Sequence, residues 1–312
     1  MGGIGVVVNP RARANRRGAD EIARRIAAVV GADGLVRVTA SLEALAEVAG
    51  EFRAHDIDIL ALCGGDGTFH CALTAFHAAY GSQPLPPLLP LRAGTINYIA
   101  DATGGRRGRP EQVVARVLRD HRRGRTHVTT ERDLLRINGQ ELGFVLGFGT
   151  VVNYLRAYYA LDRQGPRAAA GLLFRLIASA MLGTHMARAV VQPIDADVTV
   201  DGEPLPFRQF RLFLAATVDR IALGFRPTYL GTRKRGHFHV VAGPAGARDL
   251  IPRIVRFYRG FPSGLPMLYD NLGRTMTIQF FRPTHFMLDG DILPPVERLD
   301  VDVPLRVTLI RS

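Results

Sequence analysis

Gly64-Gly65-Asp66-Gly67-Thr68 follows the apolar run of residues 57–63 and precedes a helix-like stretch over residues 69–79. Three glycines in so short a span allow the backbone to adopt positive φ and to turn its N–H groups toward an anion, and the N-terminus of the following helix adds a positive dipole. A carboxylate beside a bound phosphate repels it unless the carboxylate holds a metal ion or handles a proton. The segment therefore predicts a phosphate-binding turn in which Asp66 carries part of the chemistry.

Two other predicted strands end in polar turns. Residues 90–97 read Pro-Leu-Arg-Ala-Gly-Thr-Ile-Asn and follow the apolar pair Leu88 and Leu89, while Asn9 and Pro10 close the strand-like run of residues 6–8. In an open parallel sheet, ligands bind at the carboxyl ends of the strands. We therefore expect the three turns to converge on one nucleotide.

The length and the composition predict two domains. A chain of 312 residues with 47% hydrophobic content is long enough for two sizeable cores. Strands and helices alternate through residues 1–127, which predicts an α/β domain, whereas residues 128–312 show short strands separated by Gly, Pro and Asp-Gly turns. The first domain is expected to contain strands at 4–8, 35–39, 57–62 and 88–91, and helices at 19–30, 42–54, 69–79 and 110–121.

Taken in this order, the three turns resemble the diacylglycerol kinase catalytic family, which includes bacterial lipid kinases and sphingosine kinases and is distantly related to NAD kinase. The resemblance implies an NAD kinase-like, Rossmann-like parallel sheet followed by a β-rich sandwich domain that holds the acceptor lipid. It also implies a C-terminal hairpin whose last acid is the base for the lipid hydroxyl, and here that hairpin is similar to Asp289-Gly290-Asp291.

Spacing alone does not separate this hairpin from a plain β-turn, because Asp-Gly is among the commonest hairpin signals. Asp201-Gly202-Glu203 has the same form and, taken alone, matches the motif more closely. Strong alternation over residues 299–309 places Asp291 in a β context, but only its position along the family pattern favours it as the base.

The resemblance implies an ATP-dependent kinase that uses Mg²⁺ and phosphorylates a hydroxyl of a lipid such as diacylglycerol or a sphingoid base, with a role in lipid metabolism and phospholipid biosynthesis. Asp291 would accept the proton of the hydroxyl, Asp66 would govern the nucleotide-bound Mg²⁺ and the γ-phosphate, and Asp289 would shape the turn. The nucleotide-binding residues implied by the resemblance are Asn9, Thr39, Gly64, Gly65, Asp66, Gly67, Thr68, Gly94, Thr95 and Asn97.

The chain departs from the family pattern at several positions. Residues 11–14 contain two arginines and no glycine, His70 and Cys71 stand where Asn and Glu are common, and Tyr98 stands where Asp is usual. Residues 231–236 are basic where bacterial members often carry acidic ligands of a structural Mg²⁺, which disfavours that site here. Two alternatives stay open: a nucleotide- or lipid-binding protein without transfer activity, and a soluble-metabolite kinase of the NAD kinase type.

The charge predicts an anionic partner. Forty Lys plus Arg against 28 Asp plus Glu give a net charge of +12, which attracts an anionic membrane surface or nucleic acid, although a solvated basic face explains it equally well. Nucleic acid is not expected, because no basic-aromatic recognition motif accompanies the charge. The oligomeric state stays open, with a homodimer among the states considered.

The stretch of residues 168–182 is the most apolar in the chain, but Arg175 interrupts it and it is shorter than the ~20 residues that a bilayer span requires. We expect a buried or lipid-facing amphipathic helix. Because no basic, apolar leader opens the chain, we expect a cytoplasmic protein peripheral to the membrane. Cys63 and Cys71 are expected to pack rather than react, and the pairs His70/His77 and His237/His239 lack the neighbouring ligands of a zinc site.

Overall fold

The computed structural model describes residues 2–16, 18–94, 98–102, 108–182 and 184–311. The chain forms two compact units, one of Met1–Arg132 with Arg306–Ser312 and the other of Asp133–Leu305. The predicted boundary at residue 127 differs from this division, because strands β5 (Thr129–Ile137) and β15 (Asp291–Ile310) each run from one unit into the other. The end of β15 thus belongs to the first unit, which the sequence did not predict.

The first unit contains a parallel sheet in the order β2-β1-β3-β4, with the end of β15 paired in parallel beside β4. Its strands are β1 (Ile4–Val8), β2 (Gly34–Val38), β3 (Ile59–Gly64) and β4 (Leu88–Arg92). Its helices are α1 (Ala19–Val30), α2 (Leu42–Ala54), α3 (Asp66–Tyr80), α4 (Tyr98–Ala102) and α5 (Pro110–Arg122). All eight elements expected in this region are present, and α1 and α2 have the predicted bounds.

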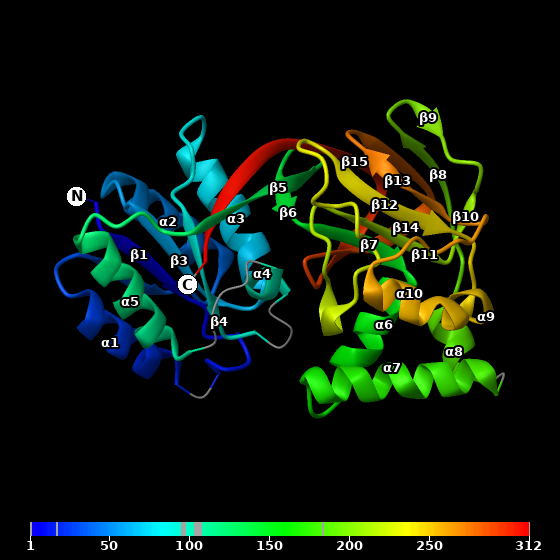
Figure 1. Ribbon diagram of the computed structural model, residues 1–312, viewed down its shortest axis with the longest axis horizontal. Coiled ribbons are helices and arrows are strands. Elements are labelled where there is room, and N and C mark those ends of the chain that lie inside the picture. The colour runs from blue at the N-terminus through cyan, green and yellow to red at the C-terminus, as the bar shows by residue number, and fades with distance from the viewer. Residues whose placement is uncertain (1, 17, 95–97, 103–107, 183, 312) are drawn as a thin grey trace. The chain divides into compact units, whose positions relative to one another are not determined.

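Helices cover both faces of this sheet, with α1 and α5 packed together and α2 and α3 packed together (Figure 1). Val6 and Ala61 belong to the core on the α1 and α5 side. On the other side, Phe52 lies so close to Gly5 that an added Cβ there would be 2.5 Å from the Phe52 ring. Burial on both faces explains why the strands read as continuous apolar runs.

The second unit is β-rich and mostly antiparallel. Its main strand order is β13-β12-β11-β7-β14-β15, β5 pairs with β15 and β6, and β8 pairs with β14, β9 and β10. The remaining strands are β6 (Glu141–Gly143), β7 (Val145–Gly149), β8 (Ile194–Val200), β9 (Glu203–Pro204), β10 (Gln209–Phe210), β11 (Leu212–Ala216), β12 (Phe238–Gly243), β13 (Tyr269–Gly273) and β14 (Met276–Leu288). The predicted fold class, an α/β domain followed by a β-rich one, is confirmed.

This unit is more helical than expected. Its helical segments are α6 (Thr150–Tyr159), α7 (Pro166–Met181), α8 (His185–Val190), η1 (Ala222–Gly224), α9 (Ala247–Leu250), η2 (Ile251–Arg253) and α10 (Ile254–Arg259). Only α7 corresponds to the predicted helical interlude; the others are ten residues or shorter and carry too little periodicity to detect. No helix among the described residues is both long enough and apolar enough to cross a membrane.

Candidate functional site

The first part of the candidate site lies along one edge of the parallel sheet. Val8 is in register with both Val38 and Cys63, and Gly64 is in register with Arg92, so the carboxyl ends of the four strands are level. The predicted residues that follow these strand ends therefore share that edge, and those described by the structure are Asn9, Thr39, Gly64, Gly65, Asp66, Gly67, Thr68 and Gly94. Thr95 and Asn97 lie outside the described residues.

Asn9 links the turn after β1 to the start of α3. Its Nδ2 donates to Thr68 Oγ1 at 2.8 Å, and its Oδ1 accepts from the Arg11 backbone N–H at 2.8 Å. Thr68 Oγ1 also accepts from the Gly65 N–H at 3.2 Å. Two turns predicted from separate segments of the sequence are thus joined by hydrogen bonds, which fixes the backbone of the glycine-rich turn.

The glycines of this turn act through close approach rather than through positive φ, which corrects the sequence-based expectation. Gly65 has φ −97°, and Gly64, Gly65 and Gly67 are not among the glycines with positive φ. A Cβ on Gly64 would lie 2.2 Å from Thr68 Oγ1, and a Cβ on Gly65 would lie 3.0 Å from the Gly94 Cα. The two turns therefore pack backbone against backbone, and only glycine leaves the necessary room.

Helix α3 begins at Asp66, three residues earlier than expected. The first-turn amides of a helix have no carbonyl partner within it, so a helix that begins at Asp66 places an N-terminus suited to anion binding at the strand-end edge. The half-buried Asp66 carboxylate accepts from the Ile99 N–H at 3.3 Å, which ties α3 to the start of α4. The glycine-rich turn has no side chains where it approaches the turn at Gly94, and a helix N-terminus follows it directly. This arrangement fits the phosphates of a nucleotide.

Asn15 is a structural residue of this edge that the sequence analysis missed. Its side chain is 1% exposed, and its Nδ2 donates to the carbonyl oxygens of Asn9 at 2.8 Å and Cys63 at 3.1 Å. It thereby binds the ends of β1 and β3 together. A single polar residue inside an arginine-rich turn gives no periodic signal, so only the contacts reveal this function.

The Asp289-Gly290-Asp291 hairpin joins β14 to β15 in the second unit. Asp289 is fully buried with φ +50°, and its Oδ1 accepts from the backbone N–H groups of Phe144 at 2.9 Å and Val145 at 2.8 Å. Its own N–H donates to the Val145 carbonyl at 3.0 Å. Asp289 therefore fixes the turn to the segment between β6 and β7. Asp291 begins β15 and is half-buried.

The competing Asp201-Gly202-Glu203 hairpin uses the same device at the surface. Asp201 has φ +52°, and its Oδ1 accepts from the backbone N–H groups of Arg274 and Thr275, both at 2.8 Å. Partial burial raises the pKa of Asp201, but these hydrogen bonds outweigh it and leave the pKa below its ordinary value. Glu203 is exposed, whereas Asp291 is half-buried. The two hairpins thus differ in burial rather than in local geometry.

Tyr159 is a second neighbour of the Asp289 hairpin, and no sequence pattern had singled it out. It is the last residue of α6, and its hydroxyl donates to the Gly290 carbonyl at 2.6 Å. The turn is therefore held from two directions, by Asp289 through the β6–β7 segment and by Tyr159 through α6. Such fixation of a turn pre-orients the residue that follows it, Asp291.

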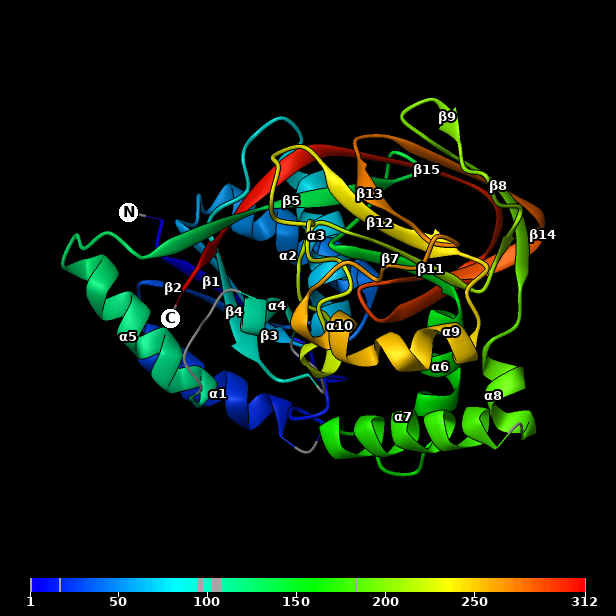
Figure 2. The same cartoon turned by 45° about the vertical axis from the view of Figure 1, so that its right-hand side comes forward.

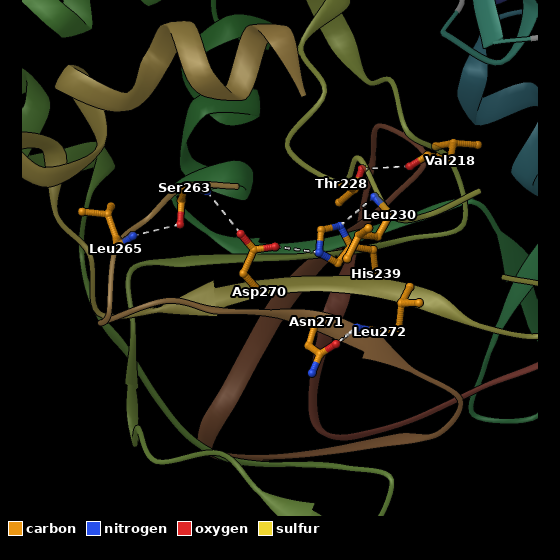
Figure 3. A network of polar contacts seen from close by, with 9 residues as sticks. All are labelled: Val218, Thr228, Leu230, His239, Ser263, Leu265, Asp270, Asn271 and Leu272. Atoms are coloured by element: carbon orange, nitrogen blue, oxygen red, sulfur yellow. Dashed lines mark hydrogen bonds and ion pairs between the residues drawn. The ribbon is translucent and has the colours of Figure 1, made fainter. Parts of the chain in front are cut away.

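Of the histidine pair His237/His239, only His239 lies in a strand, because β12 begins at Phe238. His239 is fully buried in β12, where its Nδ1 accepts from the Leu230 N–H at 3.4 Å and its Nε2 donates to Asp270 Oδ1 at 2.8 Å (Figure 3). Asp270 Oδ2 in turn accepts from the Ser263 N–H at 3.3 Å. Burial, followed by the negative charge of Asp270, raises the pKa of Tyr229 to about 12. This network ties loops to the outer strands.

Of the two cysteines expected to pack, Cys63 is buried and Cys71 is half-buried. Cys63 is a fully buried free thiol, and burial raises its pKa to about 11. His70 is 3% exposed within α3. In the part of the chain that the structure describes, no cluster of three or more His, Cys, Asp or Glu side chains is arranged to hold a metal ion.

Comparison with known proteins agrees with the strand-end geometry. Residues 3–129 match the diacylglycerol kinase catalytic domain. The resemblance predicted from the sequence is thereby confirmed for this part of the chain. A search of the curated proteins found no match.

Solved structures extend the likeness over the whole chain. A diacylglycerol kinase from Bacillus anthracis str. Sterne has a TM-score of 0.65 and 15% identity, and the alignment covers 99% of this chain and 97% of that one. Two structures described as candidate diacylglycerol kinases from the same organism have TM-scores of 0.68 and 0.69 with 14% and 13% identity, at the same coverage. At this identity the likeness establishes the fold, so both units have the architecture of those proteins.

Proposed function

We propose that the protein is an ATP-dependent lipid kinase that transfers the γ-phosphoryl group to a lipid hydroxyl. The observation that carries the proposal is the strand-end turn, in which Asn9, Thr68 and Gly65 are joined at the N-terminus of α3 within the matched diacylglycerol kinase catalytic domain. Diacylglycerol, a sphingoid base and phosphatidylglycerol are the acceptor classes that the proposal includes.

In the first unit, the amides at the start of α3 would hold the phosphates, and Thr39, Gly94, Thr95 and Asn97 would complete the nucleotide site. The helix dipole and the first-turn amides favour a bound anion without a cationic side chain. Exposed Arg11 and Arg13, in the turn after β1, add positive charge to the same edge. This arrangement supports phosphate binding at the position that the glycines keep open.

Mg²⁺ fits this site through Asp66, whose carboxylate lies at the first residue of α3. When bound, the ion supplies neutralisation of the charge that develops on the transferred phosphoryl group. The chain's own part is to position Asp66 through the hydrogen bond from Ile99 and to keep bulk away from the loop at Gly64 and Gly65.

In the second unit, Asp291 would accept the proton of the lipid hydroxyl. Asp289 cannot take this part without breaking its bonds to Phe144 and Val145, so it serves to position the turn. The half-buried setting of Asp291, compared with the exposed Glu203, supports its choice over the other Asp-Gly hairpin. Because the acceptor resides in a membrane, the protein would act as a cytoplasmic, peripheral enzyme at an anionic lipid surface.

The proposal is tested by incubating the purified protein with γ-labelled ATP, Mg²⁺ and a total lipid extract and measuring label in the organic phase. Asp66→Asn and Asp291→Asn are expected to lower turnover by at least about a hundredfold, since both groups act on the transferred phosphoryl or the attacking hydroxyl. Chromatography of the product would name the acceptor.

Glu203→Gln is the matched control, because it changes the equivalent acid of the other Asp-Gly hairpin, and it is expected to retain full activity. Full activity in Asp291→Asn would remove the assigned base. No label from protein that still binds ATP would favour the binding-protein alternative, and label that appears only with a soluble acceptor would favour a kinase of the NAD kinase type.

A further inference from the structure

Helix α7 is two-sided, and one side has no protein partner among the described residues. Its inner side, which includes Leu172 and Leu176, packs with Tyr158 of α6 and Val190 of α8 in a small core. On its outer side, Phe174 is 72% exposed and Met181 is 77% exposed. These two residues are seven apart, which places them on the same face of a helix. The outer side of a helix at a protein surface usually carries polar residues, but the outer side of α7 carries these large apolar ones.

The apolar exposure continues past the end of the helix. Leu182 is 79% exposed and Met186, in α8, is 45% exposed. In both ribbon views α7 is the outermost element of its unit, with α6 and α8 between it and the strands (Figures 1 and 2). Four large apolar side chains within residues 174–186 are thus exposed, a concentration of the kind that marks a binding surface.

Positive charge surrounds this patch. Residues 163–194 contain no Asp or Glu, and their arginines are Arg163, Arg167, Arg175 and Arg188. All four are exposed, and Arg167 lies seven residues before Phe174, on the same face of α7. Within residues 163–194 the charged side chains beside this apolar face are all cations, which is typical of a helix that lies in the interface of an anionic bilayer.

A groove at the N-terminal half of α7 adds room for a polar group. Its volume is about 560 Å³, and it is lined by Leu161, Asp162, Arg163, Ala168, Gly171 and Arg175. Two of these six residues are arginines and one is an acid, so the groove offers donors for a phosphate beside one like charge. Two residues of this lining, Gly171 and Arg175, flank Phe174 in the sequence of α7.

We propose that the outer side of α7 with the adjoining part of α8, termed the α7 surface (Arg167, Phe174, Arg175, Met181, Leu182, Met186 and Arg188), docks onto an anionic phospholipid bilayer. A second copy of the chain fits less well, because a symmetric contact would place the arginines of both copies opposite one another. Nucleic acid would neutralise the arginines but would leave the four apolar side chains in water. The inference rests on the proposed lipid kinase function, since it brings that enzyme to its acceptor.

The chain has no tryptophan, so a single one is a specific fluorescent probe. The test variant is Phe174→Trp, and the control variant is Phe281→Trp. Phe281 lies on β14 of the same unit and is 53% exposed. The full chain is titrated, without nucleotide, with vesicles of phosphatidylcholine alone or mixed with phosphatidylglycerol. We expect the tryptophan emission of the Phe174→Trp variant to shift to the blue with the mixed vesicles only, and that of the Phe281→Trp variant to stay unchanged.

Binding strength is measured by vesicle sedimentation. The double change Phe174→Ala with Met181→Ala is expected to weaken binding at least about tenfold, and Arg175→Gln about fivefold at low salt. Arg208→Gln, at an exposed arginine paired with Asp197, is the control expected to bind normally. Equal binding of all variants, or equal binding to neutral and anionic vesicles, would overturn the proposal. A change in the sedimentation velocity of these variants in the absence of vesicles would also overturn the proposal, since that result assigns the α7 surface to a contact between copies of the chain.

Failure of docking is separable from failure of the kinase function. Activity on a short-chain diacylglycerol dispersed in detergent does not require a bilayer, so the α7 variants are expected to retain it. Loss of vesicle binding with retained micellar activity supports the docking surface. Unchanged vesicle binding with normal activity refutes the surface and leaves the kinase proposal intact.

Discussion

The two Asp-Gly hairpins provide a matched pair for testing what burial contributes to a carboxylate that fixes a turn. Asp289 and Asp201 have φ +50° and +52°, and each accepts from two consecutive backbone N–H groups. They differ in environment, because Asp289 is fully buried and Asp201 is exposed. We compare Asp289→Ala with Asp201→Ala.

The expected magnitudes follow from the amides that lose their acceptor. Phe144 and Val145 are buried, so each orphaned N–H costs about 1–3 kcal/mol, or about 2–6 kcal/mol for both. Arg274 and Thr275 are exposed, so water replaces the lost carboxylate and the change costs about 1 kcal/mol. Alanine at positive φ adds a similar penalty of about 1 kcal/mol at both sites. The positive-φ penalties cancel, so Asp289→Ala is expected to destabilise its unit by about 1–5 kcal/mol more than Asp201→Ala.

Hydrogen exchange followed by mass spectrometry measures this locally, which is necessary because two compact units can unfold separately. Peptides containing Phe144 and Val145 should lose protection in Asp289→Ala and keep it in Asp201→Ala. Asp289→Asn retains one acceptor oxygen and tolerates positive φ, so it should fall between wild type and Asp289→Ala. Equal loss of protection in the two alanine variants would refute the argument that burial sets the cost.

Other predictions follow from the first unit. Asn15→Ala removes two donations in a buried position and is expected to destabilise the unit by about 2 kcal/mol in denaturant titration. Gly65→Ala is expected to weaken ATP binding at least about tenfold in calorimetry, because the new Cβ would lie 3.0 Å from the Gly94 Cα. Gly50→Ala is the control: it lies in α2 with nothing within 4 Å of the new Cβ, so ATP binding should be normal. The free energy of unfolding of this control should rise by about 0.5–1 kcal/mol, because alanine has the higher helix propensity. The raised pKa of Cys63, about 11, stabilises the fold below pH 9, and this contribution is lost as the pH rises from about 9 to about 11; Cys63→Ala should lack that part of the alkaline decline.

Much of the first unit was predictable because its signals are local. Continuous apolar runs bounded by turns predicted β1, β3 and β4, and the alternation of strands with helical stretches predicted α1 and α2 with the observed bounds. The second unit was predicted only as β-rich with one long helix. Its short helices α6 and α8–α10 are held by packing against other elements, and such short segments contain too few residues to show a period.

For the candidate site, the sequence by itself determined which residue types stand at the strand ends and in which order, because turn chemistry and strand runs are written in adjacent positions. It identified Asn9, Gly65 and Thr68, and it identified the Asp289 hairpin only by resemblance. Tertiary structure decided the rest: that Thr68 joins Asn9 and Gly65, that glycine serves close packing rather than positive φ, and that Asn15 binds β1 to β3.

Burial also came only from the tertiary structure. The two Asp-Gly hairpins have the same local sequence pattern and the same backbone conformation, yet one carboxylate is enclosed and the other is in water. Likewise, the apolar residues of α7 gave no indication of which would face the core and which would face outward. Solvent exposure depends on which distant segments pack nearby, and those segments are separated in the chain by far more residues than any local pattern spans.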